Sequence, residues 1–185
     1  MSKFATQFQM LDTLITSKTR IKLLLKFFLN SSKKAYLRGM EAEFGESSNA
    51  IRLELNRFEE AGLLNSTFEG NKKYFCANTK HPMYKDINSI MLKFTGIDKL
   101  VEKVVNELGD LKHLYLVGDL AKGLKSDVID IVLVGDIDKV YLFELIGKVE
   151  DKLFKKVKYV AYKNIEFSAD IFVASNPDYL LLWSK

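Results

Sequence analysis

The chain has 185 residues, of which 48% are hydrophobic and 28% charged, with 10 Gly and 2 Pro. This composition excludes disordered, collagen-like and low-complexity chains, because it supplies enough apolar side chains for a folded core. The length suits one large domain or two small ones, and the net charge of +4 indicates no class of partner by itself.

Three helices are predicted between residues 17 and 62. Ser17 is available as the N-cap of the first, and the second, in the segment 35–44, stops at Gly45. The third opens at Ser47 or Ser48 and ends at Gly62. The apolar residues at helical spacing are Ile21, Leu24, Leu25 and Phe28 in the first helix, Leu37, Met40 and Phe44 in the second, and Ile51, Leu55 and Phe58 in the third.

Two short β-runs follow, Leu63–Phe68 and Lys73–Ala77, with a turn at residues 69–71 between them. Two helices with a glycine-containing turn, followed by a β-hairpin with a basic tip, are typical of a winged helix-turn-helix. The order of elements, with the letters EEAGLL followed by GNKKY, resembles the ArsR-like bacterial transcription regulators over about residues 17–80. The resemblance implies a DNA-binding module whose third helix is the recognition helix.

On that helix, burial of the apolar face leaves polar side chains outward that can contact base edges, while Ser47 at the helix N-terminus favours a backbone phosphate. Asn71 and the lysines beside it at the hairpin tip are expected to reach the adjacent minor groove or the sugar-phosphate backbone, and Lys33, Lys34 and Arg38 are expected to contact the backbone from the other side. These contacts should supply salt-dependent affinity. For each lysine singly, a solubilising charge is the equal alternative, and Arg57 is either a phosphate contact or an ion-pair partner. The candidate DNA-binding residues are Arg38, Ser47, Ser48, Asn49, Arg52, Asn56, Lys72 and Lys73.

The second half of the chain alternates helices and strands. Helices are predicted over Tyr84–Phe94 and Ile97–Leu108, then strands over 113–118 and 129–135, a helix over 141–154 and a strand over 156–162. The fold class is therefore α+β, with domain 1–96 followed by a small α/β domain 97–185. Residues 1–96 carry 11 Lys and 4 Arg against 2 Asp and 7 Glu, a net +6, whereas residues 97–185 carry a net −2.

The stretch LYLVGDLAKGLKSDVIDIVLVGD, residues 114–136, resembles the signature of the nucleotidyltransferase superfamily. In that family a strand ends in Gly-Ser, and Ser-Asp-x-Asp leads into a second strand after a short helix. The glycine lets the backbone approach a triphosphate, the serine binds its oxygens, and the two aspartates hold Mg²⁺.

This chain departs from the family pattern at three positions. Gly118 is followed by Asp119, which places a carboxylate where phosphate would lie. Asp127 and Asp130 are three residues apart, so they would point to opposite faces of a regular strand. Lys158 falls at the third carboxylate position, and we expect it to neutralise one of the aspartates. These changes predict the remnant of a nucleotidyltransferase-like site, without a catalytic residue and without a metal. The remnant consists of Gly118, Asp119, Asp127, Asp130 and Lys158.

The leading hypothesis is a DNA-binding transcription regulator whose second domain senses or assembles without catalysis. The alternatives are an active, Mg²⁺-dependent nucleotidyltransferase, in which a β-bulge rearranges the aspartates, and a protein-binding adaptor. Double-stranded DNA, a small anionic or nucleotide ligand and a second copy of the chain are the expected partners, with no cofactor. A homodimer would use residues 4–15 and the helix Tyr84–Phe94, unless these cover their own core. Residues 179–183 are expected to dock on a domain surface.

The expected cellular compartment depends on whether the sequence carries a leader peptide, a membrane span or paired cysteines. Residues 1–18 show no basic, continuously apolar and cleavable leader, and no apolar run approaches the roughly 20 residues of a membrane span. Cys76 is the only cysteine, so an internal disulfide is excluded and a structural zinc site is not expected. A cytoplasmic protein that does not bind membranes is therefore expected.

Overall fold

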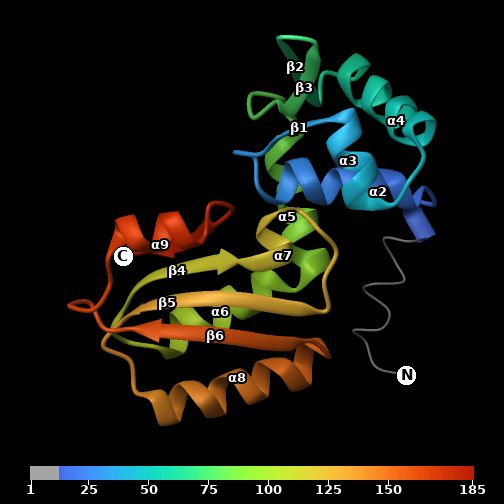
Figure 1. Ribbon diagram of the computed structural model, residues 1–185. Helices are drawn as coiled ribbons and strands as arrows, with labels where there is room; N and C mark the ends of the chain where they lie inside the picture. Colours follow the sequence, from blue (N-terminus) through green and yellow to red (C-terminus); the bar gives the residue numbers. More distant parts are fainter. Residues whose placement is uncertain (1–12) are drawn as a thin grey trace.

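The computed structural model describes residues 13–185 as a mixed α+β fold with two β-sheets. Figure 1 shows an upper lobe, built from the chain up to the hairpin β2–β3, and a lower lobe built around the second sheet. The expected α+β class is therefore confirmed. Within residues 13–185, no helix combines the length and the apolar character that crossing a bilayer requires.

The upper lobe begins with helix α2 (Lys18–Leu24), which continues directly as one π-helical turn, η1 (Leu25–Leu29). The hydroxyl of Ser17 accepts a hydrogen bond from the N–H of Arg20 at 3.2 Å, so this serine caps the helix as predicted. All five side chains of η1 are buried, including that of Lys26. The π-helical turn is thus an interior element.

Helices α3 (Leu37–Phe44) and α4 (Ser48–Glu60) follow. Helix α3 ends at Gly45, which takes a left-handed conformation with φ of 62° that glycine adopts without strain. The hydroxyl of Ser47 accepts a backbone N–H of α4 at 3.3 Å, so Ser47 and not Ser48 is the N-cap. The two helices are therefore separated by a short, capped turn, as the sequence predicts.

The upper sheet is antiparallel and has the order β1-β3-β2, with β1 spanning Lys34–Tyr36, β2 Leu64–Glu69 and β3 Lys72–Ala77. The hairpin β2–β3 matches its prediction to within one residue at each end. The prediction that Ala35 and Tyr36 belong to the second helix is wrong, because both lie in β1 and pair with β3. A three-residue strand is too short to show alternation, and its partner lies far along the chain.

The lower lobe contains seven further elements besides the adjoining helices α5 (Tyr84–Thr95) and α6 (Ile97–Glu107). The four-stranded sheet has the order β6-β5-β4-β7, in which β5 and β6 are parallel and the other pairs antiparallel. In Figure 1, α8 and α9 lie on opposite sides of this sheet. The seven elements are β4 (Leu111–Val117), α7 (Gly118–Ala121), β5 (Val128–Gly135), α8 (Lys139–Leu153), β6 (Lys156–Tyr162), α9 (Ala169–Ser175) and β7 (Leu180–Ser184).

The sequence interpretation missed two of these elements, α9 and β7. The apolar C-terminal residues were expected to dock on a surface, and they do so by adding β7 to the edge of the sheet beside β4. Helix α9 has only seven residues, of which Phe172 alone is buried. A helix this short lacks a repeating apolar face, so its periodicity gives no signal.

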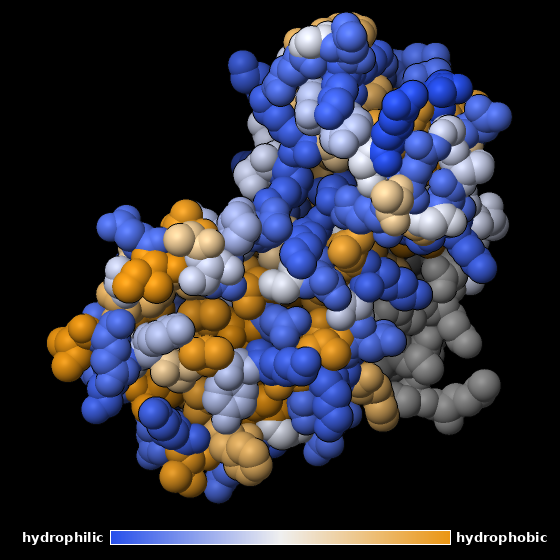
Figure 2. Space-filling model, in the orientation of Figure 1, coloured by the Kyte–Doolittle hydropathy of each residue, from blue (hydrophilic) through white to orange (hydrophobic). Residues whose placement is uncertain are grey.

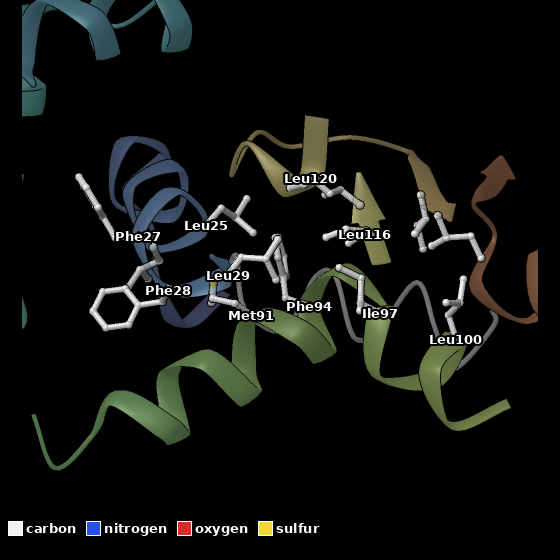
Figure 3. Packing of buried hydrophobic residues seen from close by; sticks show 14 of the residues in the cluster. Leu25, Phe27, Phe28, Leu29, Met91, Phe94, Ile97, Leu100, Leu116 and Leu120 are labelled. Atoms are coloured by element: carbon white, nitrogen blue, oxygen red, sulfur yellow. The ribbon is translucent and has the colours of Figure 1, made fainter. Parts of the chain in front are cut away.

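One continuous hydrophobic cluster joins the two lobes. Figure 3 shows Leu25 and Leu29 of η1 beside Met91 and Phe94 of α5 and near Leu120 of α7, and the same cluster continues through side chains of β4 and α6. Gly96, between α5 and α6, falls at the expected domain boundary and is left-handed with φ of 82°. Buried residues on both sides of it belong to the same cluster, so the lobes pack as neighbours around shared apolar surface.

Polar contacts of Asn30 reinforce this junction. The side chain is 1% exposed, and its amide donates to the carbonyl oxygens of Ala121 at 3.1 Å and Tyr179 at 3.4 Å. Its own oxygen accepts from the hydroxyl of Ser32 at 2.7 Å. Asn30 therefore connects the upper lobe to both α7 and the approach to β7.

The loop after α7 touches the π-helical turn at backbone distance. A Cβ atom on Gly123 would lie 2.4 Å from the Cα of Lys26, so only glycine fits. The ammonium group of Lys26 binds the carboxylate of Glu43 on α3 and also donates to the carbonyl oxygen of Lys122 at 2.9 Å. The lower lobe is thus hydrogen-bonded to a residue that also holds α3.

Candidate functional site

Helix α4 buries one face and exposes the other. Ile51, Leu55 and Phe58 are buried against the upper lobe, whereas Arg52 and Asn56 are exposed. This division is the one predicted from the apolar spacing. The hydrophilic surface of the upper lobe in Figure 2 contrasts with the apolar patches on the lower lobe.

A groove of about 540 Å³ lies between α4, the start of α3 and the tip of the hairpin. Five of the eight candidate DNA-binding residues line it: Arg38, Arg52, Asn56, Lys72 and Lys73. The floor includes apolar side chains of Leu37, Leu55 and Phe75, and Asn71 and Tyr36 complete the lining. Ser47, Ser48 and Asn49 do not line the groove and lie at the N-terminal end of α4.

The cations around the groove differ in how they are held. Lys73 binds the carboxylate of Glu59 at 2.7 Å, and that hydrogen bond is the main reason why the pKa of Glu59 lies below its usual value. Within residues 13–185, Arg38, Arg52 and Lys72 make no ion pair. Their charges are therefore available to an anionic ligand, whereas that of Lys73 is already shared.

Two aromatic contacts at this site were not anticipated. The ammonium of Lys72 lies 4.6 Å from the ring centre of Tyr36, and this ring meets that of Tyr74 edge-on at 5.2 Å. The role of Tyr36 was missed because the strand β1 was missed. The pairing of Tyr36 with Tyr74 across β1 and β3 would have indicated this aromatic contact.

An ion pair between the half-buried Arg20 and the buried Glu54 joins α2 to α4. The guanidinium of Arg20 donates to both carboxylate oxygens of Glu54, at 2.8 and 3.1 Å. Burial is the largest single influence on Glu54 and would raise its pKa, but the hydrogen bonds and charge of Arg20, with smaller contributions from Ser17 and Arg57, together outweigh it and lower the pKa. Arg57 also binds Glu54, at 3.2 Å, so in this structure it is an ion-pair partner.

Two lysines expected to contact the DNA backbone are engaged elsewhere. Lys33 pairs with the carboxylate of Asp178 in the lower lobe, so it joins the two lobes and is not free at the surface. Lys34 lies 3.4 Å from Glu69 at the hairpin, and both side chains are more than half exposed. Lys33 therefore forms an interlobe ion pair, which the sequence did not predict.

The segment that resembles a nucleotidyltransferase signature begins where β4 meets α7. Gly118 is left-handed with φ of 68°, and a Cβ atom there would lie 2.6 Å from a carboxylate oxygen of Asp130. Asp119 is exposed on α7, 3.7 Å from the ammonium of Lys122. The glycine is thus required by the neighbouring carboxylate as well as by its backbone conformation.

Two carboxylates do not come together on β5. Asp130 lies in this strand, flanked by Val117 of β4 and Lys158 of β6, whereas Asp127 precedes the strand and is exposed. The backbone carbonyl of Asp127 accepts the N–H of Lys156 at 3.1 Å. The picture of two aspartates on opposite faces of one strand is therefore wrong, because the strand starts after Asp127.

Lys158 does not form the expected ion pair. It is exposed, and within residues 13–185 no carboxylate lies within 4.0 Å of its ammonium group. Over the same residues, no group of three or more His, Cys, Asp or Glu side chains could hold a metal ion. A cation beside Asp130 and a displaced Asp127 do not fit the carboxylate set that two Mg²⁺ ions require.

The sheet face that carries Asp130 is partly covered by the chain's own aromatic side chains. Val117 pairs with Asp130, and Tyr115 lies two residues back on the same face of β4. The ring of Tyr115 lies 4.6 Å from that of Phe172 and 5.7 Å from that of Tyr179. Burial raises the pKa of the Tyr115 phenol. The C-terminal segment thus fills space over this face, which the sequence reading did not anticipate.

No protein-family model and no curated protein match the chain. Solved structures do resemble it over part of its length. A toxin-antitoxin structure with AMP-PNP is 20% identical, with a TM-score of 0.38, and covers 48% of this chain and 73% of its own. The MNT antitoxin complex with a tri-AMPylated HEPN toxin from Shewanella oneidensis is 18% identical, with a TM-score of 0.36, covering 49% and 73%.

A protein from Sulfolobus solfataricus described as a nucleotidyltransferase is 24% identical to the chain. Its TM-score is 0.33, and the match covers 48% of this chain and 78% of the other. At such scores the likeness is limited to part of the fold, and no substrate or partner is carried over from it.

Proposed function

We propose that residues 17–80 form a winged helix-turn-helix that binds double-stranded DNA, and that the protein is a DNA-binding transcription regulator. The observation that carries this proposal is the groove in which Arg38, Arg52, Asn56 and the hairpin lysines converge from three separate elements. Residues far apart in the sequence thus present one sign of charge around a single concave surface. A polyanion such as DNA suits that surface.

Helix α4 would enter the major groove with its exposed side toward the bases. Arg52 has the fork of donors that matches guanine, and Asn49 and Asn56 have amides that match adenine. Arg52 also donates to the Asn49 side chain at 3.3 Å, so the two are already oriented together. Lys72 at the hairpin tip would contact the phosphate backbone, supplying affinity and not sequence preference.

The proposal is tested by selecting bound sequences from a random duplex library and then measuring affinity by mobility shift. Replacing Arg52 by alanine should lower affinity for the selected duplex by about 1–3 kcal/mol, because a bidentate base contact is lost. Lys139→Ala, which removes an exposed charge on α8, is the control and should bind normally. Equally weak binding by wild type and R52A at physiological salt would contradict the proposal.

We also propose that the lower lobe is a non-catalytic, nucleotidyltransferase-like domain used for sensing or assembly. The positions of Asp127 and Lys158 support this, because they leave Asp130 without a second carboxylate on its strand. Incubation with labelled nucleoside triphosphates, Mg²⁺ and candidate acceptors tests it. Transfer of a nucleotidyl group would establish the enzyme alternative instead.

We propose a homodimer as the DNA-binding form. The acidic side chains on α4 reduce its positive charge, so a single copy is expected to bind DNA with modest affinity, and a second copy compensates. Most of the apolar face of α5 cannot form the dimer interface, because Met91 and Phe94 are already buried in the core of the same chain. Among the large apolar residues of this helix, only Ile90 is exposed. Residues 1–12, part of the other expected interface, lie outside the described residues. Analytical ultracentrifugation with and without DNA tests the stoichiometry.

A further inference from the structure

A second cavity, of about 400 Å³, lies between α2 and the loop that follows α7. Its lining combines apolar and cationic side chains. Among residues 13–185, every charged side chain in its lining is a lysine and none is acidic. The lining consists of Ile15, Thr16, Ile21 and Leu25 together with Lys18, Lys22 and Lys125.

The three lysines are held differently. Lys18 and Lys125 are exposed, and within residues 13–185 neither makes an ion pair. The ammonium of Lys22 binds the carboxylate of Glu46 at 2.7 Å and the carbonyl oxygen of Phe44 at 2.8 Å. Two positive charges from separate segments, α2 and the loop after α7, thus line one cavity together with apolar side chains, and the charge of Lys18 adds to the effect of Lys22 in lowering the pKa of Glu46.

We propose that this cavity binds a small amphipathic anion: an acidic head group, such as a carboxylate, sulfonate or phosphate ester, carried on an apolar body. The head group lies between Lys18 and Lys125, and the apolar body packs on Ile21 and Leu25. Inorganic phosphate has no apolar part and gains nothing from that floor. The combination of charge and apolar surface selects against it.

The same cavity reaches the proposed recognition helix through Lys22. Phe44 is the last residue of α3, and Glu46 lies in the turn that leads to α4. The hydrogen bond from Lys22 is the main cause of the lowered pKa of Glu46, which shows that the pair favours the charged carboxylate. An anion that draws Lys22 away releases both contacts, so it loosens the turn before α4. This second step rests on the proposed function.

The binding step is tested with a defined probe, 8-anilinonaphthalene-1-sulfonate, by fluorescence titration of the full chain. Lys18→Gln and Lys125→Gln should each weaken its binding about two- to fivefold, the size expected for one exposed charge pair. N-phenyl-1-naphthylamine, which lacks the sulfonate, should be unaffected by either variant. Lys122→Gln is the matched control, because Lys122 lies on the same loop and does not line the cavity. Glu46→Gln should bind the sulfonate more tightly, since Lys22 is released.

The outcomes separate the site from its coupling to DNA. Unchanged sulfonate affinity in both lysine variants, or equal losses for the neutral probe, overturns the site. If the site holds, the sulfonate should weaken duplex binding by at least about fivefold. Sulfonate binding without any effect on duplex binding overturns the coupling alone. If wild type binds no duplex, the proposed function fails, and the fluorescence titration still decides the site.

Discussion

Replacing Asn30 by alanine should lower the free energy of unfolding by about 2–4 kcal/mol. The side chain is 1% exposed and donates to the carbonyl oxygens of Ala121 at 3.1 Å and Tyr179 at 3.4 Å. Each buried polar group left without a partner costs about 1–3 kcal/mol, and the longer of the two contacts contributes less. The hydroxyl of Ser32 also loses its acceptor, but Ser32 is exposed and water replaces it at little cost.

Urea denaturation, followed by the fluorescence of Trp183 and by far-ultraviolet circular dichroism, measures this loss. Trp183 is the only tryptophan and lies in β7, whereas circular dichroism is dominated by helices in both lobes. Because one apolar cluster joins the lobes, the two signals should change together. Asn164→Ala, at an exposed position, is the control. A loss below about 0.5 kcal/mol would refute the stabilisation assigned to the contacts of Asn30. Two separate transitions in wild type would refute the view that the lobes unfold together.

Three further predictions concern single contacts. Because the pKa of Glu54 is lowered in the folded state, its pairing with Arg20 stabilises the fold above the ordinary glutamate pKa of 4.5, and this contribution is lost as the pH falls. In thermal melts, R20A should therefore destabilise the protein more at about pH 7 than at about pH 3. Gly118→Ala should lower the free energy of unfolding by at least about 1–2 kcal/mol because the backbone is left-handed, and by more because the new methyl group overlaps with Asp130. In a D130A background only the part due to overlap should be recovered, and recovery of the whole loss would contradict the backbone contribution. In duplex binding, Lys72→Gln should reduce the slope of log affinity against log salt by about 0.9, whereas an unchanged slope would exclude a phosphate contact.

Much of the upper lobe could be predicted because its signals are local. Helix caps, a left-handed glycine and apolar residues at helical spacing placed α2, α3 and α4, and the glycine turn placed the hairpin. Strand β1 could not be found in the same way, since its conformation depends on pairing with β3. The missing strand hid Tyr36, which helps to line the groove.

The lower lobe shows what register alone leaves open. The motif identifies Gly118 and Asp130 as candidate site residues from the sequence. Whether Asp127 lies on the same strand as Asp130 depends on where β5 begins. Lys158 was expected to pair with a carboxylate because it neighbours Asp130 in the sheet. Its side chain nevertheless makes no ion pair within residues 13–185, since adjacency of Cα atoms does not fix where a long, exposed side chain lies.

The sequence by itself determined the mixed α+β class, most element bounds, the basic character of the first half and the altered nucleotidyltransferase-like motif. These follow from periodicity, caps and residue identity, which act over a few neighbouring residues. Only the tertiary structure decided that the hairpin lysines and Arg52 surround one groove, that Lys33 joins the lobes, and that Lys18 and Lys125 line the same cavity. Such juxtapositions depend on packing between residues far apart in the chain, which no local pattern encodes.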